Sequence, residues 1–126
     1  MILSVSLLIA VAALQPAPAD WRALGQAESM QLSWDAGGVT RSGDITTIRI
    51  RTVPQPPRQG ENAYAISRVE LRCATGEARV ADTTNYASDG TEGLRDATNL
   101  SFSPIPPESF FATVSTEVCA PPAPAR

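Results

Sequence analysis

The sequence predicts an α+β domain: a small antiparallel β-sheet of about five to six strands, with a C-terminal helix packed on one face and tied to the sheet by a disulfide. Apolar and polar residues alternate along several segments in the middle of the chain. A helical period follows near the end, and the chain contains two cysteines, Cys73 and Cys119. Strands followed by a helix, without βαβ alternation, are typical of α+β domains.

The first half contains two predicted strands. Residues 30–35 alternate apolar and polar side chains before a pair of glycines, as a half-buried strand does. Residues 41–44 have the composition of a turn, and residues 45–53 are β-branched almost throughout, which predicts the second strand. Prolines and a glycine in residues 54–62 predict an exposed loop.

The third and fourth strands form a predicted hairpin. Residues 63–73 alternate again, and the side that carries Cys73 is predicted to face the core. A turn at residues 75–77 leads into a strand over residues 78–86, so we expect these two strands to pair antiparallel. Residues 87–99 are polar and contain glycine, which predicts a loop with one short edge strand.

The end of the chain changes to a helical period. Four apolar side chains fall on one helical face: Phe110, Phe111, Val114 and Val118. Pro107 and Glu108 suit the first turn of this helix, because proline presets the backbone and a carboxylate favours the positive end of the helix dipole. Cys119 lies at the flank of the apolar face, where its sulfur can reach the sheet.

An apolar segment over residues 2–14 predicts export, since it has the length of a signal-peptide core and falls short of the roughly 20 residues that span a bilayer. Small residues precede a predicted cut between Ala19 and Asp20. An earlier cut near residues 11–13 and an uncleaved anchor are the alternatives. The first mature residue is no cysteine, so a lipoprotein is not expected, and the periplasm or the cell surface is the predicted location.

This organisation divides the chain into a signal peptide (1–19), a single domain (20–119) and a disordered Pro/Ala-rich tail (120–126). Removal of the signal peptide from the 126 residues leaves 107, enough for one domain without a transmembrane span. In an exported protein two cysteines 46 positions apart predict a structural disulfide. A redox or metal site is the alternative, but the pair lacks C-x-x-C spacing and any histidine.

The composition limits the possible chemistry. The net charge is −3, which favours neither nucleic acid nor anionic lipid as a partner. The chain has no histidine, the commonest general base and metal ligand, so we expect no enzyme, no cofactor and no metal. An enzyme would need a site of Asp, Glu, Ser, Tyr and Arg alone. Four acidic residues could be read as calcium ligands but lack the spacing of a known loop: Asp82, Asp89, Glu92 and Asp96.

A basic stripe is the candidate binding site. If their strands pair, Arg49, Arg51, Arg68 and Arg72 lie together on the face opposite the core, where they could bind an acidic partner. An ordinary solvated face with cross-strand charge pairs is the alternative. The aromatic residues are predicted to be core, with a ligand pocket between helix and sheet as the alternative: Trp21, Trp34, Phe102, Phe110 and Phe111.

The paired-cysteine frame resembles the surface-adhesin protein E family of small exported bacterial domains. The similar features are Trp21, the strand ending at Cys73, the glycine-bearing turn before Arg79, and the proline-led helix ending at Cys119. The resemblance covers most of residues 21–119. It implies a curved antiparallel sheet of about six strands with a helix tethered by a disulfide. The namesake is implied to bind host extracellular proteins.

Two features depart from that family: this chain lacks a cysteine for N-terminal lipid anchoring, and Phe102 stands where the family has a tryptophan before the last helix. These departures limit what the resemblance implies about function.

The signal peptide, the disulfide and the resemblance together predict an exported, disulfide-stabilised, non-enzymatic binding module of the bacterial cell envelope. We expect it to be adhesin-like, with a protein or an envelope component as its partner. The alternative is a periplasmic structural or small-ligand-binding domain.

Overall fold

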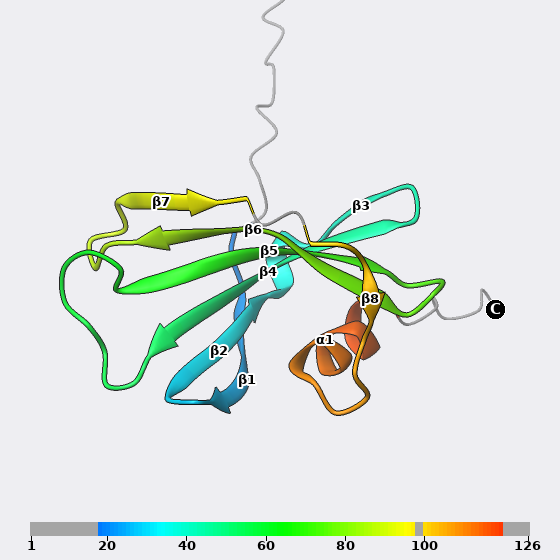
Figure 1. Cartoon of the computed structure of the whole chain (residues 1–126), viewed down its shortest axis with the longest axis horizontal. Coiled ribbons are helices and arrows are strands. Elements are labelled where there is room, and N and C mark those ends of the chain that lie inside the picture. The colour runs from blue at the N-terminus through cyan, green and yellow to red at the C-terminus, as the bar shows by residue number, and fades with distance from the viewer. Residues whose placement is uncertain (1–17, 98–99, 120–126) are drawn as a thin grey trace, which may run out of the picture.

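The computed structural model describes residues 18–97 and 100–119 and contains a curved antiparallel sheet with one α-helix against one face (Figure 1). This confirms the α+β class. Most of the predicted signal peptide, and the predicted tail at residues 120–126, lie outside the described residues. No helix in the described parts is long and apolar enough to cross a membrane.

Six strands form the main path of the sheet, in the order β1-β2-β4-β5-β6-β7, and every described pair is antiparallel. Two short strands add to it: β3 pairs with β4, and β8 pairs with β6. The elements are β1 (Trp21–Ala27), β2 (Met30–Asp35), the 3-10 turn η1 (Ala36–Gly38), β3 (Thr40–Ser42), β4 (Ile45–Pro54), β5 (Tyr64–Arg72), β6 (Glu77–Tyr86), β7 (Glu92–Asp96), β8 (Ser103–Pro104) and α1 (Phe110–Val118).

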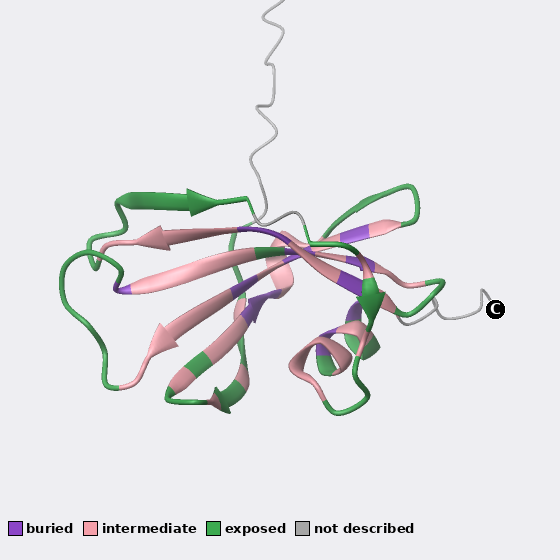
Figure 2. Cartoon of the chain, in the orientation of Figure 1, coloured by how far each residue is buried: buried purple, intermediate pink, exposed green. Residues whose placement is uncertain are grey.

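The core lies between α1 and the concave face of the central strands. Ile48 on β4 is opposite Val69 on β5, which is opposite Val80 on β6, so strand alternation places all three on the face toward the helix. Val114 and Val118 of α1 pack against this face and are buried. Figure 2 shows the buried segments gathered where the central strands run past the helix, whereas edge strand β7 is exposed throughout.

The structure adds strands that the sequence pattern does not predict. β1 pairs with β2 through a tight turn in which Glu28 and Ser29 have positive φ, 50° and 63°. Neither residue is the glycine or asparagine that usually marks such a turn, which is why the hairpin is not visible in the sequence. The predicted turn at residues 41–44 is a β3–β4 hairpin, and Pro54 ends β4 opposite Met30 instead of opening the loop.

The helix begins at Phe110, later than predicted. Ser109 is the N-cap, and its side-chain oxygen accepts a hydrogen bond of 3.2 Å from the N–H of Ala112. Pro107 and Glu108 therefore precede the helix as a turn, which corrects their predicted place in its first turn.

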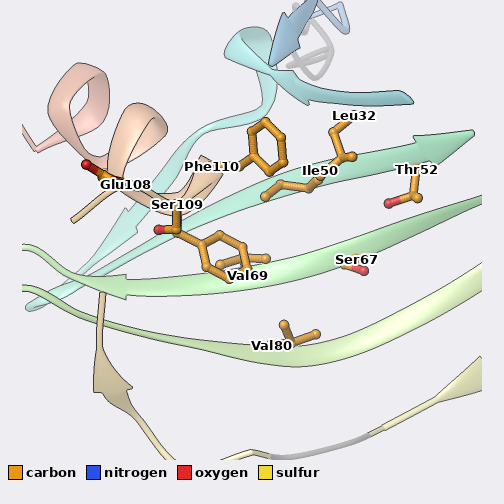
Figure 3. A pocket seen from close by; sticks show the side chains of 10 residues that line it. Leu32, Ile50, Thr52, Ser67, Val69, Val80, Glu108, Ser109 and Phe110 are labelled. Carbon is orange, nitrogen blue, oxygen red and sulfur yellow. The ribbon is translucent and has the colours of Figure 1, made fainter. Parts of the chain in front are cut away.

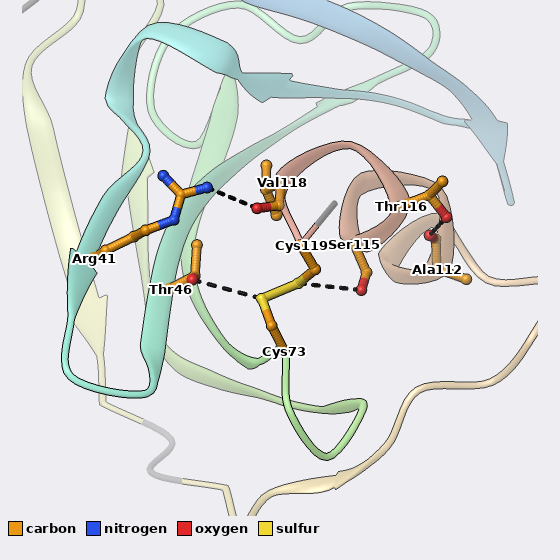
Figure 4. The surroundings of a disulfide bond; sticks show 8 residues. All are labelled: Arg41, Thr46, Cys73, Ala112, Ser115, Thr116, Val118 and Cys119. Carbon is orange, nitrogen blue, oxygen red and sulfur yellow. Dashed lines mark hydrogen bonds between the residues drawn. A yellow bond between two sulfur atoms is a disulfide. The ribbon is translucent and has the colours of Figure 1, made fainter. Parts of the chain in front are cut away.

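The predicted disulfide between Cys73 and Cys119 is confirmed, with Cα atoms 5.3 Å apart. It joins the end of β5 to the C-terminus of α1 (Figure 4). The β3–β4 hairpin contributes a second tie, because the Arg41 guanidinium donates a 2.7 Å hydrogen bond to the carbonyl of Val118. A cation at this end satisfies a carbonyl that the helix leaves unpaired. Both ties hold the C-terminus of α1 against the sheet.

Candidate functional site

A row of polar and aromatic side chains crosses the sheet on the face away from the helix. We call this row the arginine row. It contains one residue from each of five strands: Trp21, Asp35, Arg49, Arg68 and Asp82. Trp21 is opposite Asp35, Arg49 is opposite Arg68, and Arg68 is opposite Asp82, while Asp35 and Arg49 form an ion pair.

Strand alternation and one bulge place these residues on the outer face. Ile48 and Ile50 point to the core, so Arg49 between them points away from it. On β6 the register shifts: Val80 is opposite Val69, but Asp82 is opposite Arg68, so Ala81 is an extra residue. Without this bulge Asp82 would fall on the helix side of the sheet, and its carboxylate could not meet the arginines.

The ion pairs of this face are unequal in exposure. Asp35 pairs with Arg49, and the two side chains are 1% and 42% exposed. Asp82 accepts from both Arg68 and Arg95, each at 2.8 Å; its side chain is 9% exposed, and those of the arginines are 49% and 63% exposed. The carboxylates are covered while the guanidinium groups remain accessible. A partner approaching this face therefore meets positive charge.

Asp35 is held by main-chain donors as well as by Arg49. Its carboxylate accepts hydrogen bonds from the N–H groups of Asp20, at 2.7 Å, and Gly37, at 3.0 Å. Burial alone would raise its pKa, but these bonds and the Arg49 charge outweigh burial, so the pKa lies below the usual value. Gly38 has no room for a Cβ atom, which would overlap the Asp35 carboxylate.

Asp82 follows the same pattern. Burial acts to raise its pKa, and the hydrogen bonds and charges of Arg95 and Arg68 outweigh burial, so the pKa lies below its usual value. Both aspartates stay ionised at neutral pH and fix the guanidinium groups above them. Their role in this site is to position arginines.

Trp21 lies on the outer face beneath two arginines, which corrects its predicted place in the core. The guanidinium carbons of Arg49 and Arg51 lie 5.2 and 4.5 Å from the centre of its ring. Such contacts combine electrostatic attraction with desolvation of the ring. Arg51 makes no ion pair among the described residues, and its buried Nε has no hydrogen-bond partner there.

Arg72 belongs to a second cluster on the same face. Its guanidinium carbon lies 3.9 Å from the centre of the Phe102 ring, and that of Arg79 lies 4.5 Å from it. Phe102 is thus also outside the core, contrary to prediction. Arg72 is four residues from Arg68 along β5, about 13 Å at strand spacing. The four predicted stripe residues share one face, as expected, but they separate into two clusters.

The residues that the stripe prediction missed are Trp21, Asp35, Asp82 and Arg95. The alternation in β2, with Trp34 inward, would have placed Asp35 on the same face as the arginines. Two of the acidic residues considered as calcium ligands have other partners. The Asp82 carboxylate accepts hydrogen bonds from Arg68 and Arg95, and the Asp89 carboxylate accepts one from the N–H of Thr91. The described residues contain no group of three or more side chains placed to hold a metal ion.

A cavity of about 300 Å³ opens on the other face, between the start of α1 and the sheet. Its walls are mainly apolar, from Leu32, Ile50, Val69, Val80, Phe110 and Phe111, and Figure 3 shows Phe110 beside Ile50 and Leu32. Ser67 adds a hydroxyl group, which is 2.9 Å from that of Thr83. The helix–sheet pocket weighed as an alternative for the aromatic residues therefore involves Phe110 and Phe111.

Comparison with protein-family models, with curated proteins and with solved structures finds no match for this chain. The resemblance to the surface-adhesin protein E family remains a prediction from the sequence. The site is accordingly interpreted from its own geometry.

Proposed function

We propose that the chain is an exported, disulfide-stabilised, non-enzymatic binding module of the bacterial cell envelope that contacts a protein partner through the arginine row and the flanking Arg51 and Arg95. The observation that carries this proposal is the unequal exposure of the ion pairs, with accessible guanidinium groups above covered carboxylates. Guanidinium groups also supply the forked donors that recognise carboxylates.

Other features support the parts of the proposal. A structural disulfide suits an oxidising compartment outside the cytoplasm, in agreement with the signal-like N-terminus. The two buried carboxylates have lowered pKa values, which makes them poor general acids or bases near neutral pH. Their ionised state suits them to holding the guanidinium groups in place for binding.

A pull-down with matched variants tests the proposal. The protein that begins at Asp20 is immobilised and then exposed to solubilised envelope and extracellular-matrix proteins. We expect a retained protein whose recovery falls at least about fivefold in an Arg51→Gln, Arg95→Gln double variant, because binding depends on these charges. The control is Arg58→Gln, which removes an exposed arginine from the loop between β4 and β5. Retention of no protein, or equal loss in both variants, would argue against the proposal.

Location is tested separately by protease shaving of intact cells, followed by mass spectrometry of peptides from residues 21–119. Peptides released from intact cells would support an adhesin-like role at the surface. Release only after the envelope is opened would restrict the module to the periplasm and contradict surface adhesion.

The helix–sheet cavity favours one second candidate, a periplasmic domain that binds a small apolar ligand. A volume of about 300 Å³ with mainly apolar walls is at the lower limit for small-molecule sites. A thermal-shift screen with small apolar compounds tests this candidate, with Ser67→Leu as the variant that fills the cavity. Stabilisation of the parent chain but not of the variant would support it, and absence of any stabilising compound would count against it.

A further inference from the structure

Arg49 and Arg68 stand directly opposite each other on neighbouring strands. Like charges in this arrangement are destabilising, because the two Cβ atoms of an opposed pair are about 5 Å apart. Each arginine is ion-paired on its far side, Arg49 to Asp35 on β2 and Arg68 to Asp82 on β6. The two cations are neighbours, and no carboxylate lies between them. The space between them is therefore suited to an anion.

Two further cations flank this pair. Arg51 lies two residues along β4, about 7 Å away at strand spacing, where the Trp21 ring holds its guanidinium. Arg95 on β7 reaches the same carboxylate of Asp82 as Arg68. Two arginines share Asp82, and Arg51 makes no ion pair among the described residues. The area around Arg49 and Arg68 therefore has more positive than negative charge.

The acidic residues of the same face restrict what kind of anion can bind. Glu70 pairs with Arg79 and Glu77 is opposite Arg72, while Glu92 accepts from the Tyr86 hydroxyl at the other end of β6. A uniformly charged polymer, such as a nucleic acid or a sulfated polysaccharide, would place negative groups over these carboxylates. A polypeptide can present one or two carboxylates to the arginines and uncharged side chains elsewhere.

We infer that the space between Arg49 and Arg68, flanked by Arg51 and Arg95, binds carboxylate side chains of an acidic polypeptide segment. This inference rests on the proposed function and assigns the chemistry of its partner. The buried Asp35 and Asp82 act as positioning residues that hold the guanidinium groups ready, so little side-chain ordering is needed on binding. Guanidinium and carboxylate meet in a bidentate geometry that Lys would not reproduce.

Direct titration tests the inference, with tryptophan fluorescence as the readout, because Trp21, one of the two tryptophans, has its ring beneath Arg49 and Arg51. The probe is a blocked peptide of alternating glutamate and glycine, and its control replaces every glutamate with glutamine. We expect saturable binding of the glutamate peptide only, weakening as salt rises. The affinity should fall at least about fivefold in Arg51→Gln and in Arg68→Gln and stay unchanged in Arg58→Gln.

Three outcomes would overturn the inference: no saturable binding of the glutamate peptide at low salt, equal binding of the glutamine peptide, or equal loss of affinity in Arg58→Gln. Tighter saturable binding of heparin or inorganic phosphate through Arg51 and Arg68 would also overturn it and identify another anion. Arg68→Gln leaves Asp82 paired with Arg95, and the melting temperature of each variant checks its folding. A partner captured through Arg51 and Arg95 without peptide binding would leave the proposed function intact and refute the carboxylate assignment alone.

Discussion

The main-chain N–H of Asp20 donates a 2.7 Å hydrogen bond to the carboxylate of Asp35. The Asp20 carbonyl in turn accepts from the N–H of Ala36, at 2.8 Å. Asp20 is the residue that the predicted signal-peptide cut would make the first of the mature chain. After that cut the nitrogen would be an ammonium group next to a buried carboxylate. Removal of the signal peptide would thus add an ion pair to the support of the arginine row.

The first prediction follows from this contact. The protein that begins at Asp20 should be more stable near pH 7 than the protein carrying Gly-Ser-Gly before Asp20, by up to about 1 kcal/mol, because both forms make the hydrogen bond to Asp35 and only the first adds a charge to it. The advantage requires the ammonium form, so it should be present below about pH 8, the ordinary range of an α-amino group, and lost at strongly alkaline pH. Urea unfolding at pH 7 and pH 10.5 measures both effects.

Asp35→Asn serves as the control for the N-terminal prediction. It removes the carboxylate that an ammonium group would pair with, so the two forms of the chain should then differ little. Equal stability of both forms at pH 7 with Asp35 intact would contradict the prediction.

The second prediction concerns acid. Asp35 and Asp82 both have pKa values lowered in the folded chain, so their contribution to stability is present above their unfolded values of about 3.9. It is lost as the pH falls through the lower, folded values, because the protonated carboxyl groups no longer pair with arginines. The free energy of unfolding should be nearly constant from pH 5 to 7 and decline below about pH 4. Urea titrations across this range provide the measurement.

Asp82→Asn should be less stable at pH 7 and show a shallower decline in acid than the parent chain. Asp44→Asn is the matched control, since Asp44 is an exposed carboxylate in the turn between β3 and β4, outside the arginine row. An unchanged acid profile in Asp82→Asn would refute this account of Asp82.

The third prediction tests the packing beneath the row. Gly38→Ala should move the Asp35 carboxylate away from Arg49, because the new methyl group would overlap that carboxylate. We expect a loss of stability of about 1–3 kcal/mol, with a shallower acid decline. Ser42→Ala, on the exposed strand β3, should change neither. Unfolding curves at pH 7 and pH 3 distinguish the two variants, and parent-like behaviour of Gly38→Ala would exclude the proposed overlap.

The central strands could be predicted because their signal is local. β2, β4, β5 and β6 each have one face on the core, so apolar and polar residues alternate within each strand regardless of its neighbours. Ile48 and Val69 show this most clearly. The arginine face follows from the same alternation, because the positions between core residues must point outward.

The remaining features depend on contacts that a local pattern does not encode. The orientation of Asp82 is set by the bulge at Ala81, which appears only when β5 and β6 are paired. Hydrophobicity alone predicts a core position for Trp21 and Phe102, yet arginines cover their rings on the outer face. A side chain with a long aliphatic stem and a planar cation can shield an aromatic ring as a core does. No pattern within β1 or before β8 distinguishes these two environments.

The fourth prediction concerns the tether between helix and sheet. Cys73→Ser should reduce the free energy of unfolding by about 2–5 kcal/mol, because the unfolded chain loses a crosslink that closes a long loop. The reduced parent chain should lose a similar amount, whereas Ser42→Ala should lose little. Arg41→Gln isolates the second tie: losing its hydrogen bond to the Val118 carbonyl should cost about 1–2 kcal/mol and add to the effect of Cys73→Ser. Thermal unfolding of oxidised and reduced chain provides the measurement, and equal melting temperatures would show that the disulfide does not stabilise the packing of α1.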